Sequence, residues 1–344
     1  MFLDSHATLF LPYQENLIPQ PEPGQRVLLI NGHPDFPSSG WAAEMKIFQP
    51  FYPYAAALEQ RGFAVSPQWP PAGESFDHIL IRGSKVHVET AGFLAEGLMR
   101  LKTGGWLVAA AGNHEGGSRL PKDCKTLAFA AQNLSKHHAR IVCGRKTGRE
   151  DAAVCREWIA RAAMQPVIDG RFISQPGLFS WDHADSGSAL LTEHLPDDLI
   201  GAGADFGCGF GYLADYILRH NPQITALFCI DADARAIECC RCNLAALKSQ
   251  ARITCLWDDL ASPVSDMPEL DWVVMNPPFH EGKADQIALG QGFIRSAAAA
   301  LKPGGRLYMV ANAHLPYEKT LSMMFARVRK VAEKKGYKIY EARA

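Results

Sequence analysis

Three segments in the first half of this chain recur, in the same order, in the second half. The longest match aligns Leu101–Val108 (LKTGGWLV) with Leu301–Tyr308 (LKPGGRLY). The other matched pairs are 76–80 with 270–274 and 26–32 with 202–209. Any one match has little weight, but three in one order indicate that a single α/β unit was duplicated. The length of 344 residues also suits two domains of ordinary size.

The two copies differ at the positions where chemistry is expected. The first copy has one glycine, Gly32, after its first strand, where the second copy has three. Arg82-Gly83-Ser84-Lys85 stands where the second copy has Asn276-Pro277-Pro278-Phe279. We therefore expect the N-terminal copy to be degenerate: it keeps the residues that form the fold and has lost those that react.

Apolar segments that alternate with amphipathic ones run through the second half, a pattern typical of a parallel sheet covered by helices on both faces. We expect strands at 204–207, 226–231, 252–257, 270–275 and 306–310, and helices at 212–219, 234–247 and 293–301. Segments 329–333 and 337–342 flank a turn and predict a closing β-hairpin. Arg149–Met164 predicts a connecting helix, so we place the domains at 1–150 and 176–344, with a linker helix and loop at 151–175.

The composition is that of a globular protein with a full core, and it excludes several classes. Apolar residues make up 47% and the net charge is −1, so neither a disordered chain nor one that is basic throughout is expected. No apolar run reaches the ~18–20 residues of a membrane helix, and the first residues do not resemble a signal peptide. We therefore expect a cytoplasmic protein with no membrane partner.

The nine cysteines are consistent with small core residues in a reducing compartment. Cys239 and Cys242 form one C-x-x-C pair, whereas a structural zinc site needs two such pairs, or one pair and histidines. Cys240 falls on an apolar helical stripe with Ile237 and Leu244. The sequence therefore predicts no metal site.

A glycine-rich turn, Asp205-Phe206-Gly207-Cys208-Gly209-Phe210-Gly211, follows the first strand of the second copy and opens a helix. Glycines there permit positive φ angles and let a ligand approach the main chain closely. Asp231 ends the next strand, where a carboxylate can accept hydrogen bonds from the hydroxyls of a ribose. Such a site suits NAD, FAD or S-adenosylmethionine equally well.

Asn276-Pro277-Pro278-Phe279 follows the fourth strand directly. It therefore lies at the carboxyl edge of the sheet, where open α/β folds bind ligands. Asn276 Oδ1 and the Pro277 carbonyl can each accept one N–H of an exocyclic amine, which turns the nitrogen lone pair toward an electrophile. Pro278 stiffens the turn, and Phe279 offers a face on which a flipped base can stack. The segment favours methyl transfer to an amine over hydride transfer.

Together these motifs resemble class I S-adenosylmethionine-dependent methyltransferases that act on amines. Segments 276–282 (NPPFHEG), 310–317 (VANAHLPY), 176–180 (PGLFS) and 185–188 (DSGS) are similar to those of the ribosomal RNA small subunit methyltransferase C family. The likeness is specific in 175–344 and diffuse before 150.

The resemblance implies an α/β fold of two tandem Rossmann-like class I methyltransferase domains. Each would have a mostly parallel seven-stranded sheet with a terminal antiparallel hairpin, and the first would be inactive. It also implies methylation of the N2 amine of a guanosine in 16S rRNA within the small ribosomal subunit, with S-adenosylmethionine as the cofactor.

The resemblance further assigns roles by position. Asn276, Pro277, Pro278 and Phe279 would be the catalytic residues. Asp231 would hold the ribose and Asp258 the adenine amine, for which Asp259 competes; segment 185–188 would fold over the methionine end of the cofactor. The full set expected to bind the cofactor is Asp205, Phe206, Gly207, Gly209, Gly211, Asp231, Asp258, Phe179, Ser180 and Ser188.

Basic residues are dense between Arg119 and Arg149, a window in which Asp123 is the one acid. This local excess suits phosphate contacts, which supply affinity without sequence information, although a solvated helix face explains it equally well. The RNA-binding candidates are Arg119, Lys122, Lys125, Arg140, Arg145, Lys146 and, beside the Asn-Pro-Pro-Phe motif, His280. The N-terminal domain is thus expected to dock RNA or to support folding.

Other functions remain open at this point. A sister family methylates guanosine N2 in 23S rRNA and shares most of these motifs. Glutamine N5 methylation of a protein and adenine N6 methylation also use Asn-Pro-Pro followed by an aromatic residue. A non-catalytic RNA-binding or assembly factor would keep the fold, but the second copy also retains the reactive residues.

Overall fold

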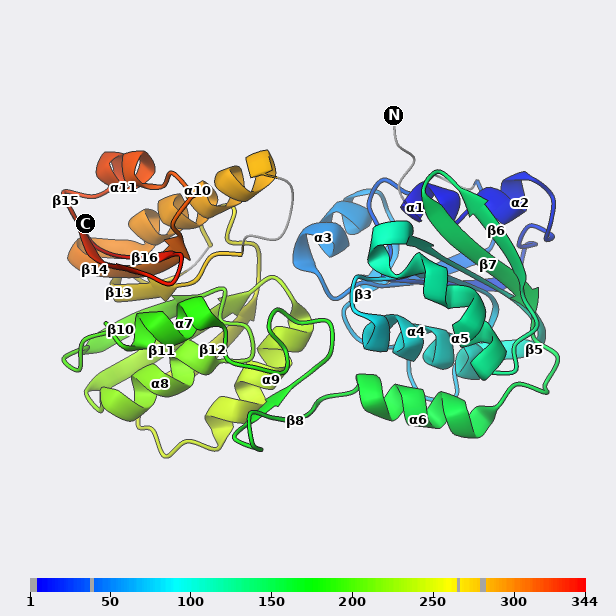
Figure 1. Cartoon of the computed structure of the whole chain (residues 1–344), viewed down its shortest axis with the longest axis horizontal. Helices are drawn as coiled ribbons and strands as arrows, with labels where there is room; N and C mark the ends of the chain where they lie inside the picture. Colours follow the sequence, from blue (N-terminus) through cyan, green and yellow to red (C-terminus); the bar gives the residue numbers. More distant parts are fainter. Residues whose placement is uncertain (1–4, 38–39, 265–266, 279–282) are drawn as a thin grey trace. The chain divides into compact units, whose positions relative to one another are not determined.

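The two halves of the chain form two compact units, Met1–Gln165 and Pro166–Ala344, each built on a seven-stranded sheet (Figure 1). The computed structural model describes residues 5–37, 40–264, 267–278 and 283–344. The strand order is β3-β2-β1-β4-β5-β7-β6 in the first sheet and β12-β11-β10-β13-β14-β16-β15 in the second. When the strands of each seven-stranded sheet are numbered along the chain, the two orders are identical, so the expected duplication of one α/β unit is confirmed.

In the first unit, five parallel strands are followed by an antiparallel hairpin. The strands are β1 (Arg26–Ile30), β2 (Glu44–Phe48), β3 (Ala64–Ser66), β4 (Phe76–Arg82), β5 (Leu101–Gly112), β6 (Gln132–Lys136) and β7 (Ala139–Arg145). The helices are α1 (Ser5–Thr8), α2 (Leu11–Gln14), α3 (Tyr52–Gln60), α4 (His87–Arg100), α5 (Leu120–Thr126) and α6 (Ala152–Ala162), with 3-10 turns at Asn113–Glu115 and Gly117–Arg119. Alternate residues of β4 serve the two faces: Ile79 and Ile81 pack with α4, whereas Leu80 packs with α3.

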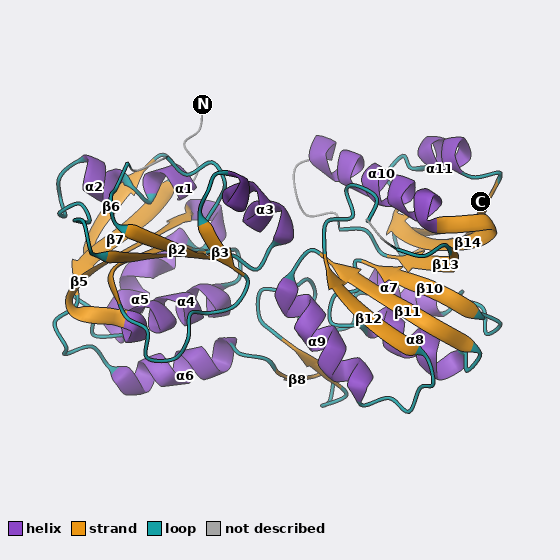
Figure 2. Ribbon diagram, turned by 180° about the vertical axis from the view of Figure 1, so that it is seen from behind, coloured by secondary structure: helices purple, strands orange, loops and turns teal. Residues whose placement is uncertain are grey.

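The second unit repeats this plan. Its sheet strands are β10 (Gly201–Phe206), β11 (Ile224–Asp231), β12 (Arg252–Trp257), β13 (Leu270–Met275), β14 (Leu301–Asn312), β15 (Arg327–Lys334) and β16 (Tyr337–Arg343), and β8 (Gln165–Val167) pairs with β9 (Phe172–Ser174) ahead of them. The helices are α7 (Ser186–Thr192), α8 (Tyr212–His220), α9 (Ala234–Ala245), α10 (Lys283–Ala300) and α11 (Glu318–Met324). Helices α7 to α9 cover one face of the sheet and α10 and α11 the other (Figure 2). The expected closing hairpin is β15–β16.

Helix α10 differs from its expected range of 293–301, because it begins at Lys283 and ends at Ala300. Glycines weaken a helix, but Gly290 and Gly292 are present here for packing. A Cβ on Gly290 would lie 2.0 Å from Tyr317 Oη, and one on Gly292 would lie 2.9 Å from the Ala261 carbonyl oxygen. Leu301 belongs to β14 because it pairs with Leu270.

The helix expected as a connector, α6, packs on α4 within the first unit. Gly92 of α4 makes room for it, since a Cβ there would lie 2.3 Å from Ala162 Cβ. Cys155 of α6 is buried in the same cluster as the apolar face of α4. The division between the units falls between Gln165 and Pro166, inside the segment expected as a linker, and the helical part of that segment belongs to the first unit.

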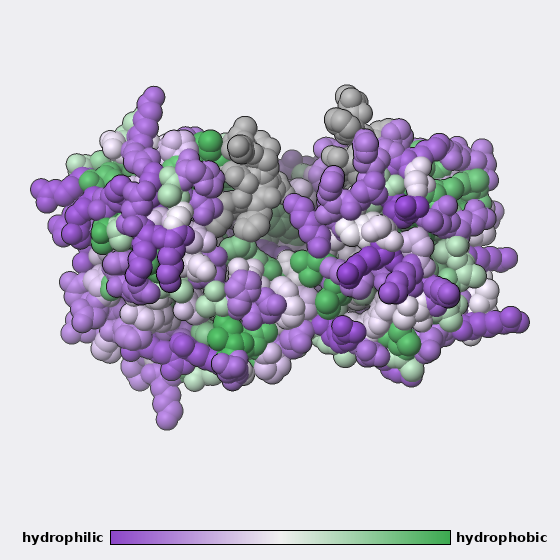
Figure 3. Space-filling view, in the orientation of Figure 1, coloured by the Kyte–Doolittle hydropathy of each residue, from purple (hydrophilic) through white to green (hydrophobic). Residues whose placement is uncertain are grey.

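The surface is mostly hydrophilic on the face drawn in Figure 3, with hydrophobic residues in small separate patches. Within the described residues, no helix has both the length and the apolar character that a membrane crossing needs.

We predict that Gly92→Ala destabilises the protein by about 1–3 kcal/mol, because the added methyl group has no room between α4 and α6. Urea unfolding of the full chain followed by circular dichroism measures the effect. Adding Ala162→Gly should restore much of the loss, since that change removes the atom in the way. Wild-type stability of Gly92→Ala alone would contradict the packing of α6 on α4.

Candidate active site

The glycine turn after β10 is held against β11 and leaves part of its main chain open. Gly207, Gly209 and Gly211 have φ angles of 75°, 54° and 91°, which favour glycine. The Gly207 and Cys208 N–H groups both donate to the Ile230 carbonyl, at 2.8 and 3.0 Å. A Cβ on Gly209 would meet nothing within 4 Å, so a ligand can reach the main chain there.

Asp205 and Phe206 lie beneath this turn and are fully buried. Asp205 Oδ2 accepts a hydrogen bond from Ala214 N in the first turn of α8, at 3.1 Å, and burial raises the pKa of its carboxyl. Phe206 packs in the core on the α10 face. Both side chains therefore support the turn from below. Asp205 Oδ1 has no hydrogen-bond partner among the described residues, and direct contact of Asp205 or Phe206 with a cofactor stays a prediction.

Asp231 stands beside the turn with its carboxylate engaged by main-chain donors. Its Oδ2 accepts from Gly209 N at 2.8 Å and its Oδ1 from Asp233 N at 2.9 Å. Burial raises the pKa of Asp231 to about 6, and these two hydrogen bonds limit the rise. The carboxylate thus connects the open part of the glycine turn to the end of β11.

Asp258 is placed next to Asp231, because β12 pairs with β11 up to their ends. Its N–H donates to the Asp231 carbonyl at 3.2 Å. Each carboxylate also accepts a main-chain hydrogen bond: Asp258 Oδ1 from Asp259 N at 2.7 Å and Asp259 Oδ1 from Ala261 N at 2.9 Å. The main-chain contact with Asp231 is the one feature that favours Asp258 over Asp259 as the ligand contact.

The Asn276 side chain is buried at the end of β13, and its amide is held in one orientation. Its Nδ2 donates to Asp185 Oδ2 and to Ser188 Oγ, both at 2.8 Å. Because an ionised carboxylate can only accept hydrogen bonds, the amide nitrogen must face Asp185, and Oδ1 points the other way. Among the described residues no donor reaches the buried Asn276 Oδ1.

Asn276 also adjoins the glycine turn. Its carbonyl oxygen lies 3.8 Å from where a Cβ of Gly207 would be. Pro277 is buried and Pro278 is exposed. Phe279 and His280, expected to stack on a base and to touch RNA, lie outside the described residues. The Asn-Pro-Pro segment and the turn therefore share one edge of the sheet, as predicted.

Segment 185–188 contacts Asn276, a role that the sequence reasoning missed. Asp185 caps α7 by accepting from Ser188 N at 2.8 Å with the same oxygen that faces Asn276. Gly187 is needed between them, since a Cβ there would lie 2.9 Å from a Tyr337 ring carbon. The Asp-Ser-Gly-Ser pattern signals a helix N-cap, but its partner 91 residues away has no local signal. Phe179 is exposed and Ser180 has a positive φ of 46°, as in a tight turn ahead of this segment.

The first unit has different residues at each matching position of its sheet. Strand register aligns Asn31 with Gly207, Gln49 with Asp231 and Arg82 with Asn276. Arg82 Nε and Nη2 donate to Asn31, at 2.8 and 3.0 Å. The residues described between β1 and β2 include no helix, whereas α8 follows the turn in the second unit. The N-terminal copy thus has neither the glycine turn nor the Asn-Pro-Pro segment at this edge, and its loss of activity stays a prediction.

The basic candidates of the first unit do not form one patch. Arg140 and Arg145 lie at opposite ends of β7. Lys146 Nζ donates to the Leu98 and Leu101 carbonyls at 2.6 and 2.7 Å, and burial lowers its pKa. Lys146 therefore holds the end of α4. The remaining candidates, which are exposed together on or beside α5, are Arg119, Lys122 and Lys125.

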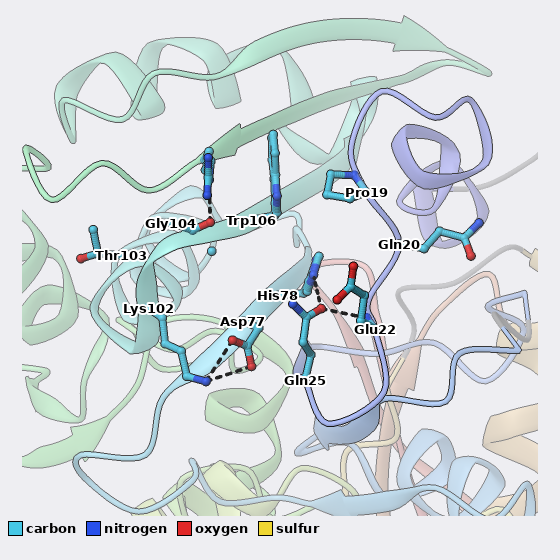
Figure 4. Close-up of a pocket in the computed structure, with 12 residues that line it drawn as sticks. Pro19, Gln20, Glu22, Gln25, Asp77, His78, Lys102, Thr103, Gly104 and Trp106 are labelled. Atoms are coloured by element: carbon cyan, nitrogen blue, oxygen red, sulfur yellow. Dashed lines mark hydrogen bonds and ion pairs between the residues drawn. The ribbon is translucent and has the colours of Figure 1, made fainter.

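A cavity of about 320 Å³ opens near the amino ends of β4 and β5 in the first unit (Figure 4). Arg145 lines it and donates to the Gly104 carbonyl at 2.8 Å. His78, between Tyr13 and Gln25, has a pKa lowered to about 4 by burial and is therefore neutral. This cavity lies at the opposite end of the strands from the position that matches the candidate site, so it is not a remnant of that site.

Comparison with known proteins relates the chain, and the second unit in particular, to methyltransferases. The model of the family described as "Methyltransferase small domain" matches residues 169–341. Ribosomal RNA small subunit methyltransferase C of Shewanella halifaxensis is 32% identical over 292 residues, 84% of this chain and 82% of that protein. The protein of the same name from Shewanella loihica is 39% identical over 167 residues, 48% and 47% of the two chains.

One solved structure matches nearly the whole chain. It is the 16S rRNA N2 G1207 methyltransferase of T. thermophilus in complex with AdoMet and guanosine, with a TM-score of 0.78 and 22% identity, covering 98% of this chain and 91% of that one. The match confirms the expected fold of two tandem α/β units.

We predict that Gly211→Ala destabilises the protein by about 1–2 kcal/mol, because alanine disfavours a φ of 91° and its Cβ would lie 3.0 Å from Cys240 Sγ. Thermal unfolding measures the change. The matched control is Gly209→Ala, whose Cβ would meet nothing and which should cost less. Equal costs would show that the contact with Cys240 is unimportant.

Proposed function

Since the chain belongs to the ribosomal RNA small subunit methyltransferase C family, we propose that it transfers a methyl group from S-adenosylmethionine to the N2 amine of a guanosine in 16S rRNA. Family membership rests on the relative that is 32% identical over 84% of this chain. The observation that carries the chemistry is the Asn276 amide, whose nitrogen is bound and whose oxygen has no donor among the described residues. The assembled small subunit as substrate, and a cytoplasmic location, belong to the same proposal.

The residues present fit the cofactor. Gly209 offers open main chain beside the Asp231 carboxylate, where the ribose hydroxyls would donate. Asp258 would accept from the adenine amine next to it. When bound, S-adenosylmethionine supplies an electrophilic methyl group on a positively charged sulfur.

Asn276 then has a defined task toward the guanine. Its Oδ1 accepts one N2–H, and the Pro277 carbonyl is the proposed acceptor for the other. With both hydrogens held, the nitrogen lone pair points away from the ring plane and toward the methyl group. The negative charge of Asp185 beside Nδ2 polarises the Asn276 amide. Oδ1 therefore carries more negative charge and becomes a better hydrogen-bond acceptor. Methylation leaves the nitrogen positively charged, and loss of one N2 proton completes the reaction.

The names of the relatives support 16S rRNA over 23S rRNA, protein glutamine or adenine as the substrate. The intact set of site residues in the second unit supports an enzyme rather than a non-catalytic assembly factor. For the first unit we propose RNA docking through Arg119, Lys122 and Lys125, which are exposed on or beside α5.

Asn276→Ala should lower turnover on small ribosomal subunits at least about a hundredfold, because it removes a preorganised acceptor. Asp185→Asn should lower turnover as well, since an amide at 185 can also donate and no longer forces the orientation of Asn276. Tritiated methyl transfer measures turnover, and calorimetry measures S-adenosylmethionine affinity, which for Asn276→Ala should stay within about twofold of wild type.

If Asn276→Ala retained full turnover, the amine-positioning role would be rejected. Transfer to protein or to large subunits rather than to small subunits would reject the proposed substrate. An equal loss of cofactor affinity in both variants would assign these residues to cofactor binding.

S-adenosylmethionine affinity should fall as pH drops through about 6, because the Asp231 pKa is raised to about 6 and the ionised carboxylate is the form that accepts from hydroxyls. Only the ionised fraction binds well, so we expect about tenfold weaker binding at pH 5 than at pH 7. Calorimetric titration across this range measures it. Asp231→Asn should bind weakly at every pH, with a flat profile; a wild-type slope in that variant would assign the effect to another group.

The triple variant Arg119→Gln, Lys122→Gln, Lys125→Gln should weaken RNA binding and lower the slope of log affinity against log salt by about two to three, if each cation contacts one phosphate. Filter binding at several salt concentrations gives the slope. The matched control replaces three cations that are already in ion pairs, Lys136, Arg329 and Lys330, with glutamine. Equal slopes for the two triple variants would remove the docking role.

A further inference from the structure

Four cysteines that are far apart in the sequence meet beneath the glycine turn of the second unit. Cys208 lies in the turn, Cys229 on β11, Cys240 on α9 and Cys255 on β12. Cys229 and Cys255 are direct partners in the parallel pairing of their strands, so their side chains project to the same face. Helix α9 covers that face and brings Cys240 over them.

Three of the sulfur atoms are close enough to share one ion. The Sγ atoms of Cys229, Cys240 and Cys255 all lie within 4.8 Å of one another. Cys208 packs in the same buried cluster, and its Sγ donates to the Gly209 carbonyl at 3.6 Å. Tetrahedral zinc with Zn–S bonds of about 2.3 Å needs sulfurs about 3.8 Å apart, so shifts of about 1 Å or less bring Cys229, Cys240 and Cys255 to that spacing.

We propose that Cys208, Cys229, Cys240 and Cys255 form a structural site for Zn²⁺. The donor set consists only of thiols, which select soft ions such as Zn²⁺ over the hard cations that prefer oxygen. The site would link the glycine turn, helix α9 and strands β11 and β12. Structural zinc ions contribute directly to the free energy of folding. The proposal is independent of the proposed methyl transfer.

One member of the cluster reaches the surface. Cys255 is partly exposed, so an ion can enter from its side.

This site differs from the C-x-x-C pair, Cys239 and Cys242, which the sequence pattern does not favour as a zinc site. Cys239 and Cys242 of the C-x-x-C pair do not belong to it: Cys239 packs with Phe172 and Phe210 in another cluster, and Cys242 is exposed. The prediction of no metal site considered that pair alone. The cluster arises only when the strand register and the helix are known, because its members are spread over residues 208–255.

The test uses the full chain, stripped with a chelator and kept reduced, and titrated with Co²⁺ as a spectroscopic substitute for Zn²⁺. Tetrahedral cobalt thiolate has intense visible absorption bands. We expect them to saturate at one Co²⁺ per chain and to vanish when Zn²⁺ is added. Added Zn²⁺ should also raise the thermal unfolding midpoint of the stripped protein, because an ion that binds only the folded state stabilises it.

Cys255→Ser should weaken metal binding at least about a hundredfold; its partial exposure makes it the ligand least costly to replace. Cys242→Ser, on the same helix as Cys240 but outside the cluster, is the matched control and should bind as wild type does. The proposal is overturned if wild type develops no cobalt bands, or if Cys242→Ser and Cys255→Ser lose binding equally. Circular dichroism of Cys255→Ser separates a lost ligand from a lost fold, and the wild-type titration decides the question without any variant.

Discussion

An ionised carboxylate cannot donate a hydrogen bond, and this constraint organises the candidate site. Asp185 presents one oxygen to both the start of α7 and the Asn276 amide nitrogen. The amide therefore has one orientation, with its oxygen directed away from Asp185. Asp185 Oδ2 therefore both caps α7 and orients Asn276 Oδ1, the proposed acceptor for the substrate amine. The stability of α7 is thus linked to the geometry of the proposed reaction.

The carboxyl edge of the second sheet brings together residues from four separate strands. The glycine turn follows β10, Asp231 ends β11, Asp258 follows β12 and Asn276 follows β13. Parallel strands make this convergence unavoidable once their order is fixed. In the first unit the same edge carries Asn31, Gln49 and Arg82, which hydrogen-bond within their own unit. The duplicated sheet is therefore kept in the first unit with different residues at this edge.

Much of this arrangement could be predicted from the sequence, because it depends on local patterns. The ranges of β12 and β13 match the predicted strands residue for residue, since their largely apolar, β-branched and aromatic residues are bounded by polar turns. The start of α10 could not be predicted, because Gly290 and Gly292 look unfavourable until Tyr317 and Ala261 are seen packed against them. The roles of Asp185, Asp205 and Phe206 also depended on burial and on partners distant in the sequence. Cys208, Cys229, Cys240 and Cys255 come together only through strand register.

The contacts of Arg82 have an evolutionary consequence. Its guanidinium is bonded to the main chain and the side chain of Asn31, while Gln49 Nε2 donates to the Gly32 carbonyl. Replacing any one of these residues with its counterpart in the second unit would leave polar groups of the others without hydrogen-bond partners. It would not recreate a ligand site. If the first unit once had a ligand site at this edge, regaining it would require changes at several of these positions together, because each side chain now satisfies another.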